Sequence, residues 1–185
     1  MRCWLLLVGL LAGTAQAQSP HIIGASVGLG VQDLDSTENH SSSGGDNYVG
    51  DIYYRYMWNA NIGVEAGAFA GSSGIAGAIG GIFSRIADIN YRGYRAVFYG
   101  QYPLSESNSL YLKAGASRNQ LQYTLLEGIG GEPSQEVDSN GTDFYGALGW
   151  QLRFQSGIGI NVEYQYVPIQ TLTVQNFNIG VSYRF

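Results

Sequence analysis

The sequence has two histidines, His21 and His40, and these are its first candidates for acid–base chemistry. Ser41 follows His40, so a base lies next to a hydroxyl nucleophile, a combination used in group transfer. His40 lies in a stretch rich in Ser, Asn and Gly (residues 36–45), and His21 lies close to the N-terminus. Catalysis requires a nucleophile, a base and an orienting group held rigidly within hydrogen-bond reach. We therefore expect no catalytic residues and no enzyme activity.

Carboxylates gather between residues 126 and 143, where their oxygens could hold Ca²⁺. They are Glu127, Glu132, Glu136, Asp138 and Asp143. Their spacing matches no calcium-loop motif, so we expect a solvated acidic surface and no metal site. The glycines of residues 128–131 are followed by neither the Lys nor the helix of a phosphate-binding loop, and we expect no cofactor.

A third set of charged residues occurs singly within segments that otherwise alternate apolar and small side chains. These residues are Arg55, Glu65, Arg95, Lys113, Arg153 and Glu163. Charges of this kind are suited to ion pairing if the fold brings them into one interior. Whether the fold brings these charges together depends on the segments that carry them.

Eight segments alternate apolar and polar residues with a period of two, as half-exposed strands do. They cover about residues 22–32, 48–58, 62–70, 91–104, 110–125, 142–154, 157–167 and 173–185. In each, we expect the charged residues to lie on the small, polar face. The sequence is 12% charged, with 27 glycines, 14 tyrosines and a mean hydropathy of −0.05. This composition is typical of a barrel with its apolar residues facing outward; a soluble β-sandwich is the alternative.

The connections between these segments alternate in length. Residues 33–47, 71–90 and 126–141 are long, residues 59–61, 105–109 and 155–157 are short, and residues 168–172 are intermediate. Aromatic residues cluster at the strand ends beside the short connections: Tyr56, Trp58, Tyr102, Phe154, Tyr183 and Phe185. Short periplasmic turns, longer extracellular loops and an aromatic girdle are the pattern of outer-membrane barrels. The sequence therefore predicts an all-β, eight-stranded antiparallel transmembrane barrel.

The inward charges can now be placed. An eight-stranded barrel is just wide enough for side chains to fill, and an unpaired buried charge is costly. If the 59–61 turn is centred on Ala60, then Arg55 lies directly opposite Glu65. We predict this pair, with Lys113, Arg153 and Glu163 completing a lumenal network. The network could gate a narrow ion path, or it could be part of a closed core, which the narrow lumen favours.

Residues 1–17 have the features of a secretory signal peptide, leaving residues 18–185 as the barrel. Arg2 is followed by the apolar residues 4–11 and by the small-residue cleavage site Ala-Gln-Ala at residues 15–17. The single cysteine, Cys3, lies within this signal, so we expect neither disulfides nor lipidation. Without Arg2 the chain has 9 − 1 = 8 basic and 14 acidic residues, and this acidity argues against a nucleic-acid partner.

The chain ends in an alternating strand whose pattern resembles the C-terminal assembly signal of bacterial outer-membrane barrels. The residues of this pattern are Asn178, Gly180, Tyr183 and Phe185. The resemblance implies that the outer-membrane assembly machinery is a partner.

Three further segments resemble the OmpA/OmpX-type family of small outer-membrane barrels: residues 162–168 (VEYQYVP), 180–185 (GVSYRF) and 102–115 (YPLSESNSLYLKAG). The length also suits the accessory-colonisation-factor AcfA branch. The resemblance implies a monomer in the bacterial outer membrane, surrounded by lipid and lipopolysaccharide. No domain follows the barrel segments, so we do not expect the cell-wall tethering of full-length OmpA. Because this fold serves adhesins, enzymes and structural proteins, the resemblance leaves activity open.

Two main functions are compatible with a small outer-membrane barrel of this kind. The extracellular loops could bind a host or cell-surface ligand in adhesion or colonisation, which we favour because exposed, irregular sequence is concentrated on one rim. The candidate ligand-binding residues are Asp35, Glu38, His40, Phe83, Arg85, Glu132, Glu136 and Asp138. Alternatively, the protein is a structural envelope barrel; modification of lipid A is the less favoured possibility. The apolar, Gly-rich residues 74–86 could extend two strands, pack over the barrel mouth or bind a partner.

Overall fold

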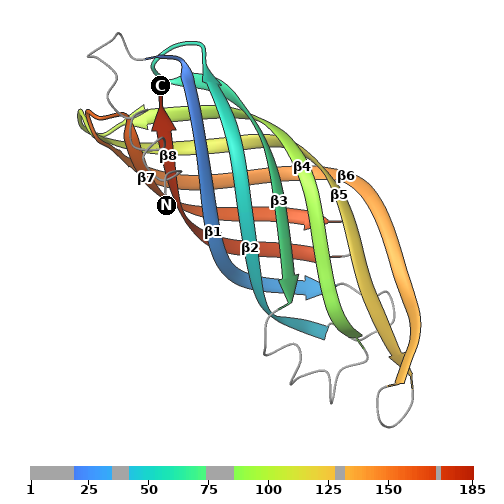
Figure 1. Ribbon diagram of the computed structural model, residues 1–185. Coiled ribbons are helices and arrows are strands. Elements are labelled where there is room, and N and C mark those ends of the chain that lie inside the picture. The colour runs from blue at the N-terminus through green and yellow to red at the C-terminus, as the bar shows by residue number, and fades with distance from the viewer. Residues whose placement is uncertain (1–18, 35–41, 74–85, 128–131, 170–171) are drawn as a thin grey trace, which may run out of the picture.

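The chain forms a closed antiparallel barrel of eight strands, seen in a computed structural model that describes residues 19–34, 42–73, 86–127, 132–169 and 172–185 (Figure 1). Each strand pairs with its neighbours in sequence, and β1 pairs with β8 to close the sheet. The strands are β1 His21–Leu34, β2 Ser42–Met57, β3 Ile62–Ser73, β4 Ile86–Pro103, β5 Asn108–Glu127, β6 Glu132–Arg153, β7 Ile158–Ile169 and β8 Leu172–Arg184. The predicted fold class is confirmed. The described residues include no helix that could cross a membrane.

Side chains alternate between the lumen and the outside along each strand. In β7, Asn161, Glu163 and Gln165 are buried, whereas Val162 and Tyr164 between them are exposed. The interior therefore holds many polar and charged residues and the outside is apolar, unlike in a soluble sandwich. This arrangement follows from the period of two, because successive Cβ atoms of a strand point to opposite faces.

The short connections lie together at one end of the barrel, as predicted, and local hydrogen bonds form their turns. In the β2–β3 turn, the Asn59 Oδ1 accepts hydrogen bonds from the backbone N–H groups of Asn61 and Ile62, both at 2.8 Å. In the β6–β7 turn, Gly157 has φ +86°, a conformation that favours glycine. Its carbonyl accepts a hydrogen bond from the Arg184 N–H at 3.0 Å.

The opposite end of the barrel differs from the prediction. The connection expected at residues 126–141 is largely strand, because β5 continues to Glu127 and β6 begins at Glu132. Their pairing continues from Gln122 opposite Asp138 to Glu127 opposite Glu132, with one register shift on the way. The β6 part of this extension, residues 132–141, lacks period-two alternation and so is not marked as a strand, whereas the predicted segment 110–125 includes most of the β5 part. Figure 1 shows the resulting hairpin reaching beyond the other strands.

Two other expected loops are shorter than predicted. β2 begins at Ser42, inside the expected 33–47 loop, and β4 begins at Ile86, inside the expected 71–90 loop. Most of the Gly-rich segment 74–86 lies outside the described residues, as does the predicted signal peptide.

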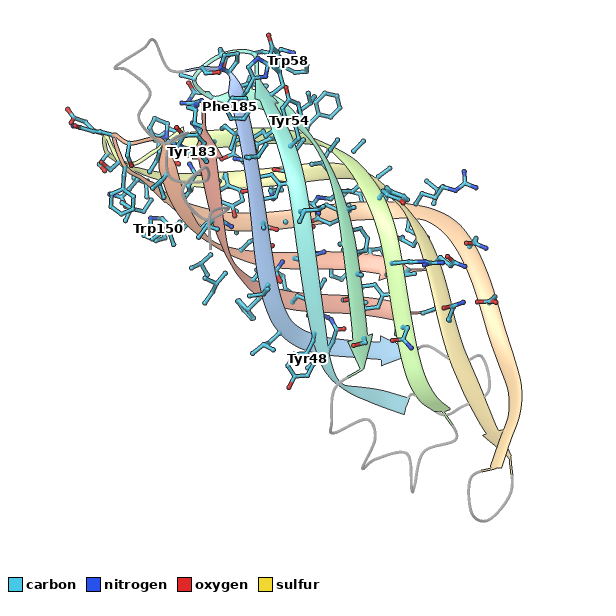
Figure 2. The ribbon with its side chains drawn as sticks, viewed as in Figure 1. Tyr48, Tyr54, Trp58, Trp150, Tyr183 and Phe185 are labelled. Atoms are coloured by element: carbon cyan, nitrogen blue, oxygen red, sulfur yellow. The ribbon has the colours of Figure 1, made fainter. Side chains whose placement is uncertain are left out.

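The aromatic girdle lies where the sequence placed it. Tyr54, Trp58, Tyr183 and Phe185 gather at the short-turn end, whereas Tyr48 lies towards the other end (Figure 2). Aromatic side chains favour the interface between lipid and water, so this end marks the periplasmic boundary of the apolar belt.

The C-terminal residues complete the closure of the barrel. The backbone N–H of Phe185 donates to the carbonyl of His21 at 3.2 Å, and the two rings stack with their centroids 5.9 Å apart. Asn178 and Gly180 face the lumen, and Tyr183 is half-buried. The Asn178 amide donates to Gln165 Oε1 at 2.7 Å. All four residues therefore lie in the closing strand or at its end, and their role as an assembly signal stays a prediction.

Two glycines offer a test of how tightly the sheet closes. A Cβ on Gly180 would lie 2.8 Å from the backbone oxygen of Ala25 in β1, whereas a Cβ on Gly100 would have no heavy atom within 4 Å. We expect Gly180→Ala to lower the free energy of unfolding by about 1–3 kcal/mol through overpacking. Gly100→Ala should change it by no more than about 1 kcal/mol, in the stabilising direction. Urea unfolding in lipid vesicles measures both, and equal effects would contradict tight closure at Gly180.

Candidate functional site

A buried carboxylate on β3, Glu65, is the centre of the lumen. Its Oε2 accepts hydrogen bonds from Arg55 Nη2 at 2.6 Å and from Arg55 Nε at 2.9 Å, across the β2–β3 register in which the two residues are directly opposite. Its Oε1 accepts from Arg95 Nη2 at 2.7 Å and lies 2.9 Å from Lys113 Nζ. One carboxylate thus binds three cations from three different strands.

Two further carboxylates balance these cations. Glu163 Oε2 lies 2.7 Å from Lys113 Nζ and accepts a hydrogen bond from the Tyr111 hydroxyl at 2.9 Å. Arg95 forms an ion pair with Asp51, with a hydrogen bond of 3.0 Å from Nη2 to Oδ1. We call these six residues the charge network: Asp51, Arg55, Glu65, Arg95, Lys113 and Glu163. Three positive and three negative charges, all buried, leave the network formally neutral, as its burial requires.

Aromatic rings pack against the cations of the charge network. The Arg55 Cζ lies 3.5 Å from the centroid of the Tyr99 ring, and Arg95 Cζ lies 4.9 Å from that of Tyr145. Lys113 Nζ is 4.9 Å from the Tyr53 centroid. Cation–π contacts are strongest where the cation has lost its water, as here. Alternation placed these tyrosines on the inward face, but sequence reasoning did not predict which cation each ring would contact.

Arg153 is not part of this network, which corrects the prediction. It is half-buried at the end of β6 and donates hydrogen bonds to the Gly157 carbonyl at 3.1 Å and to Gln151 Oε1 at 3.0 Å. The sequence identified it as inward-facing, but its position beside a short turn keeps it away from Glu65, which lies farther along the lumen. Asp51 takes its place in the network.

Apolar and aromatic side chains fill the lumen on both sides of the charge network. One cluster lies towards the short turns: Ile22, Met57, Tyr99 and Tyr111. A larger one lies towards the other end: Val49, Phe69, Tyr91, Val97, Leu121, Tyr145, Ala147, Val167, Ile169, Leu172 and Val174. Beside the larger cluster, the Asn47 amide donates to the Tyr91 hydroxyl at 2.8 Å and to Asn176 Oδ1 at 2.6 Å. These layers favour a closed core over an ion path.

The residues considered for catalysis and metal binding do not form a site within the described residues. His21 Nδ1 lies 2.5 Å from the Tyr54 hydroxyl, among aromatic rings at the periplasmic end. His40 and Ser41 lie outside the described residues. No three His, Cys, Asp or Glu residues in the described part of the chain are grouped so as to hold a metal ion.

The candidate ligand-binding residues divide into two groups. Five lie outside the described residues: Asp35, Glu38, His40, Phe83 and Arg85. Glu132, Glu136 and Asp138 lie on β6 and not in a loop, and the Asp138 side chain is exposed. These three positions belong to the paired extension of the β5–β6 hairpin.

The closed eight-stranded sheet, its polar interior and its apolar belt agree with a family match. The profile of the outer membrane protein beta-barrel domain matches residues 3–185. The chain belongs to this family. As a member of the outer-membrane β-barrel family, it is located in the bacterial outer membrane.

Solved structures share the barrel at low sequence identity. Neisserial surface protein A covers 92% of this chain and 100% of its own, with 14% identity and a TM-score of 0.66. The match to OprG of Pseudomonas aeruginosa covers 91% of this chain and 97% of OprG, with 13% identity and a TM-score of 0.59. The match to the attachment invasion locus protein Ail of Yersinia pestis covers 89% of this chain and 98% of Ail, with 18% identity and a TM-score of 0.56. At these identities the likeness shows the fold alone.

Another structure of Ail, in complex with the heparin analogue sucrose octasulfate, matches with a TM-score of 0.55 and 18% identity. It covers 89% of this chain and 99% of its own. A search of curated proteins finds no match to the chain.

Replacement of Glu65 tests the charge network. We expect Glu65→Gln to lower the free energy of unfolding by about 3–5 kcal/mol, because it leaves buried cations without their shared carboxylate. Glu106→Gln, at an exposed position in the β4–β5 turn, is the matched control and should change stability by less than about 0.5 kcal/mol. Urea titration of the barrel in vesicles, followed by gel mobility without heating, measures both. Similar midpoints for the two variants would show that the network contributes nothing.

The filled lumen predicts the electrical behaviour of the protein. In planar bilayers we expect no stable open state from the unaltered barrel, because apolar layers flank the charge network on both sides. Glu65→Gln should not open a path, since Tyr145 and Leu121 remain buried beyond it. A large steady conductance that rises in this variant would contradict the closed core and favour a gate.

Proposed function

We propose that this outer-membrane barrel is a surface-exposed binding protein of adhesion or colonisation type, and that it binds its ligand through the outer part of the β5–β6 hairpin. The observation that carries the proposal is the length of these strands. β5 has 20 residues and β6 has 22, whereas β3 and β7 have 12 each. The extra length is paired backbone that extends past the apolar belt, so it presents a stiff edge to the medium.

The acidic composition of this extension indicates the kind of ligand. Glu127 and Glu132 are directly opposite each other near its tip, and Glu136 and Asp138 follow on β6. Complementary charge increases both the association rate and the specificity of binding. We therefore expect a ligand with a basic surface, such as a cationic region of a host matrix or cell-surface protein. Ail, which shares the fold, is described with an anionic heparin analogue, and the carboxylates here favour a ligand of the opposite charge.

The packed interior of the barrel supports a ligand-binding site on its outside. The charge network and the two apolar clusters occupy the lumen, which favours a closed core over a transport path. His21 begins β1 beside Tyr54 and Phe185, and Figure 1 shows β1 starting at the end of the barrel opposite the long ends of β5 and β6. We accordingly propose a protein without enzyme activity. A purely structural envelope role remains the second candidate, supported by the closed sheet and the continuous outward apolar belt.

Shortening the hairpin tests the proposal. Residues 123–137 are replaced by Asn-Gly, which joins Gln122 to Asp138, a pair already in register, through a two-residue turn. We expect the variant to remain folded, because the belt and the closing strands are untouched, and to lose binding of intact cells to host matrix and epithelial surfaces. The measurements are the heat-dependent gel mobility of the barrel and the adhesion of cells that display it.

A charge variant separates the effect of the hairpin's length from the effect of its acidic side chains. Glu132→Lys with Glu136→Lys keeps the hairpin length and should also abolish binding, whereas Glu106→Lys on the periplasmic side should not. Undiminished adhesion by the shortened barrel would contradict a hairpin-borne site. No adhesion by the unaltered barrel would favour the structural envelope role.

A further inference from the structure

Two arginines face away from the lumen on the outer wall of the barrel, which corrects the expectation that the charged residues of every strand lie on the polar, inward face. Arg92 on β4 and Arg118 on β5 are exposed, whereas every other Arg or Lys that the structure describes is buried or half-buried. An arginine on the lipid-facing side is costly at the midplane of a bilayer and is tolerated near its surface. These two side chains therefore mark the height at which the apolar belt ends on this side of the barrel.

The register places the arginines diagonally next to each other. Arg92 is opposite Gln120, and Tyr94, two residues along β4, is opposite Arg118. Diagonal neighbours on one face of a sheet lie within reach of long side chains. Arg92 Nε donates a hydrogen bond to Gln120 Oε1 at 2.9 Å, which fixes one guanidinium in place. No described carboxylate forms an ion pair with either arginine.

A hollow of about 450 Å³ lies at these side chains. Its outward-facing lining consists of Ala68, Arg92, Tyr94, Arg118, Gln120 and Asn140. Two cations, a phenol and two amides form a set of hydrogen-bond donors that suits an anion with several oxygens, such as a phosphate group. The nearest described carboxylate on the same face of the sheet is Asp138, which is opposite Gln122 and so lies farther from the belt.

An apolar groove of about 740 Å³ adjoins this basic hollow. It runs over β8, β1, β2 and β3 to Asn90 of β4, and Gly50 forms its floor, because a Cβ there would have no heavy atom within 4 Å. The larger outward side chains around it are Val27, Leu29, Tyr48, Phe177 and Ile179. Ala70 of the groove is directly opposite Arg92 of the hollow, so the two depressions meet at the boundary of β3 and β4.

The groove begins at the height of the arginines, at Ser72 and Asn90, and reaches deeper into the bilayer towards β8. One row of paired residues runs across the sheet from Arg92 through Ala70, Gly50 and Val27 to Ile179. Arg92 is far from the short-turn end of β4, whereas Ile179 is close to that end of β8. Because the strands are tilted, the row descends from the basic hollow towards the membrane interior.

We infer that the basic hollow and the apolar groove together bind one phosphorylated glycolipid of the outer leaflet, of the lipid A class. A phosphate group is bound by Arg92 and Arg118 at the membrane surface, and an acyl chain lies over Gly50 in the groove. The occupant is a lipid and not a protein segment, because the groove lies within the part of the wall that faces the bilayer. The order of the two depressions, cationic above and apolar below, matches the order of headgroup and acyl chain.

The test is a binding measurement on the intact barrel refolded in a zwitterionic detergent, with native mass spectrometry counting bound lipid A. Arg92→Gln with Arg118→Gln should weaken binding about tenfold or more, because charge-assisted hydrogen bonds to phosphate are lost. Arg92→Lys with Arg118→Lys, which keeps both charges, should restore most of the affinity. Lipid A without its phosphates should bind the unaltered barrel as weakly as lipid A binds the Gln variant.

Matched glycine variants test the groove. Gly50→Leu fills it and should weaken binding several-fold, whereas Gly100→Leu, at an equally open outward position near the short turns, should not. Heat-dependent gel mobility verifies that each variant is folded. Unchanged affinity in the Gln variant, or equal losses in the two glycine variants, would overturn the proposal. It would also fail if inorganic phosphate bound as tightly as lipid A and Gly50→Leu had no effect, which would indicate a site for free phosphate.

Discussion

Hydrogen bonding between β1 and β8 closes the sheet, and in hydrocarbon this closure leaves no row of backbone groups unpaired. The other features of the molecule depend on it. Closing eight strands gives a lumen that side chains can fill, so the interior must be packed like a core although many of its residues are polar or charged. The outside then has to be apolar over the height of the bilayer, and the period of two along each strand satisfies both requirements with one pattern.

The narrow lumen explains the composition of its interior. Six charges from five strands are buried there in equal numbers of each sign, with Glu65 contacting Arg55, Arg95 and Lys113. Such a cluster is compatible with burial only when each charge has partners, and the tyrosine rings add contacts to the cations. The charge network and its flanking apolar clusters therefore act as the core of this protein. They also leave the outer surface as the place where recognition can occur.

The outer surface has two parts with different physical roles. The β5–β6 extension is paired backbone at the far end of the barrel, and its sequence is acidic. Arg92 and Arg118 lie at the top of the belt, where headgroups replace acyl chains. The arginines of β4 and β5 thus place positive charge nearer the short turns, and the acidic residues of the β5–β6 extension lie farther out along the strands. This separation is consistent with anchoring to anionic lipid and with recognition of a basic partner by one barrel.

Local sequence determined the number of strands, the direction of most side chains and the pairing of Arg55 with Glu65, because period-two alternation and a three-residue turn are local features. Only the tertiary structure decided which inward charges meet. Arg95 reaches Asp51 from a strand that is not adjacent to β2, and Arg153 remains apart near a short turn. The outer part of β6 escaped prediction because pairing outside the bilayer requires no apolar face, whereas β5 was predicted to about residue 125. The closeness of Arg92 to the Gly50 groove depends on strand register and tilt around the closed barrel, which local alternation does not specify.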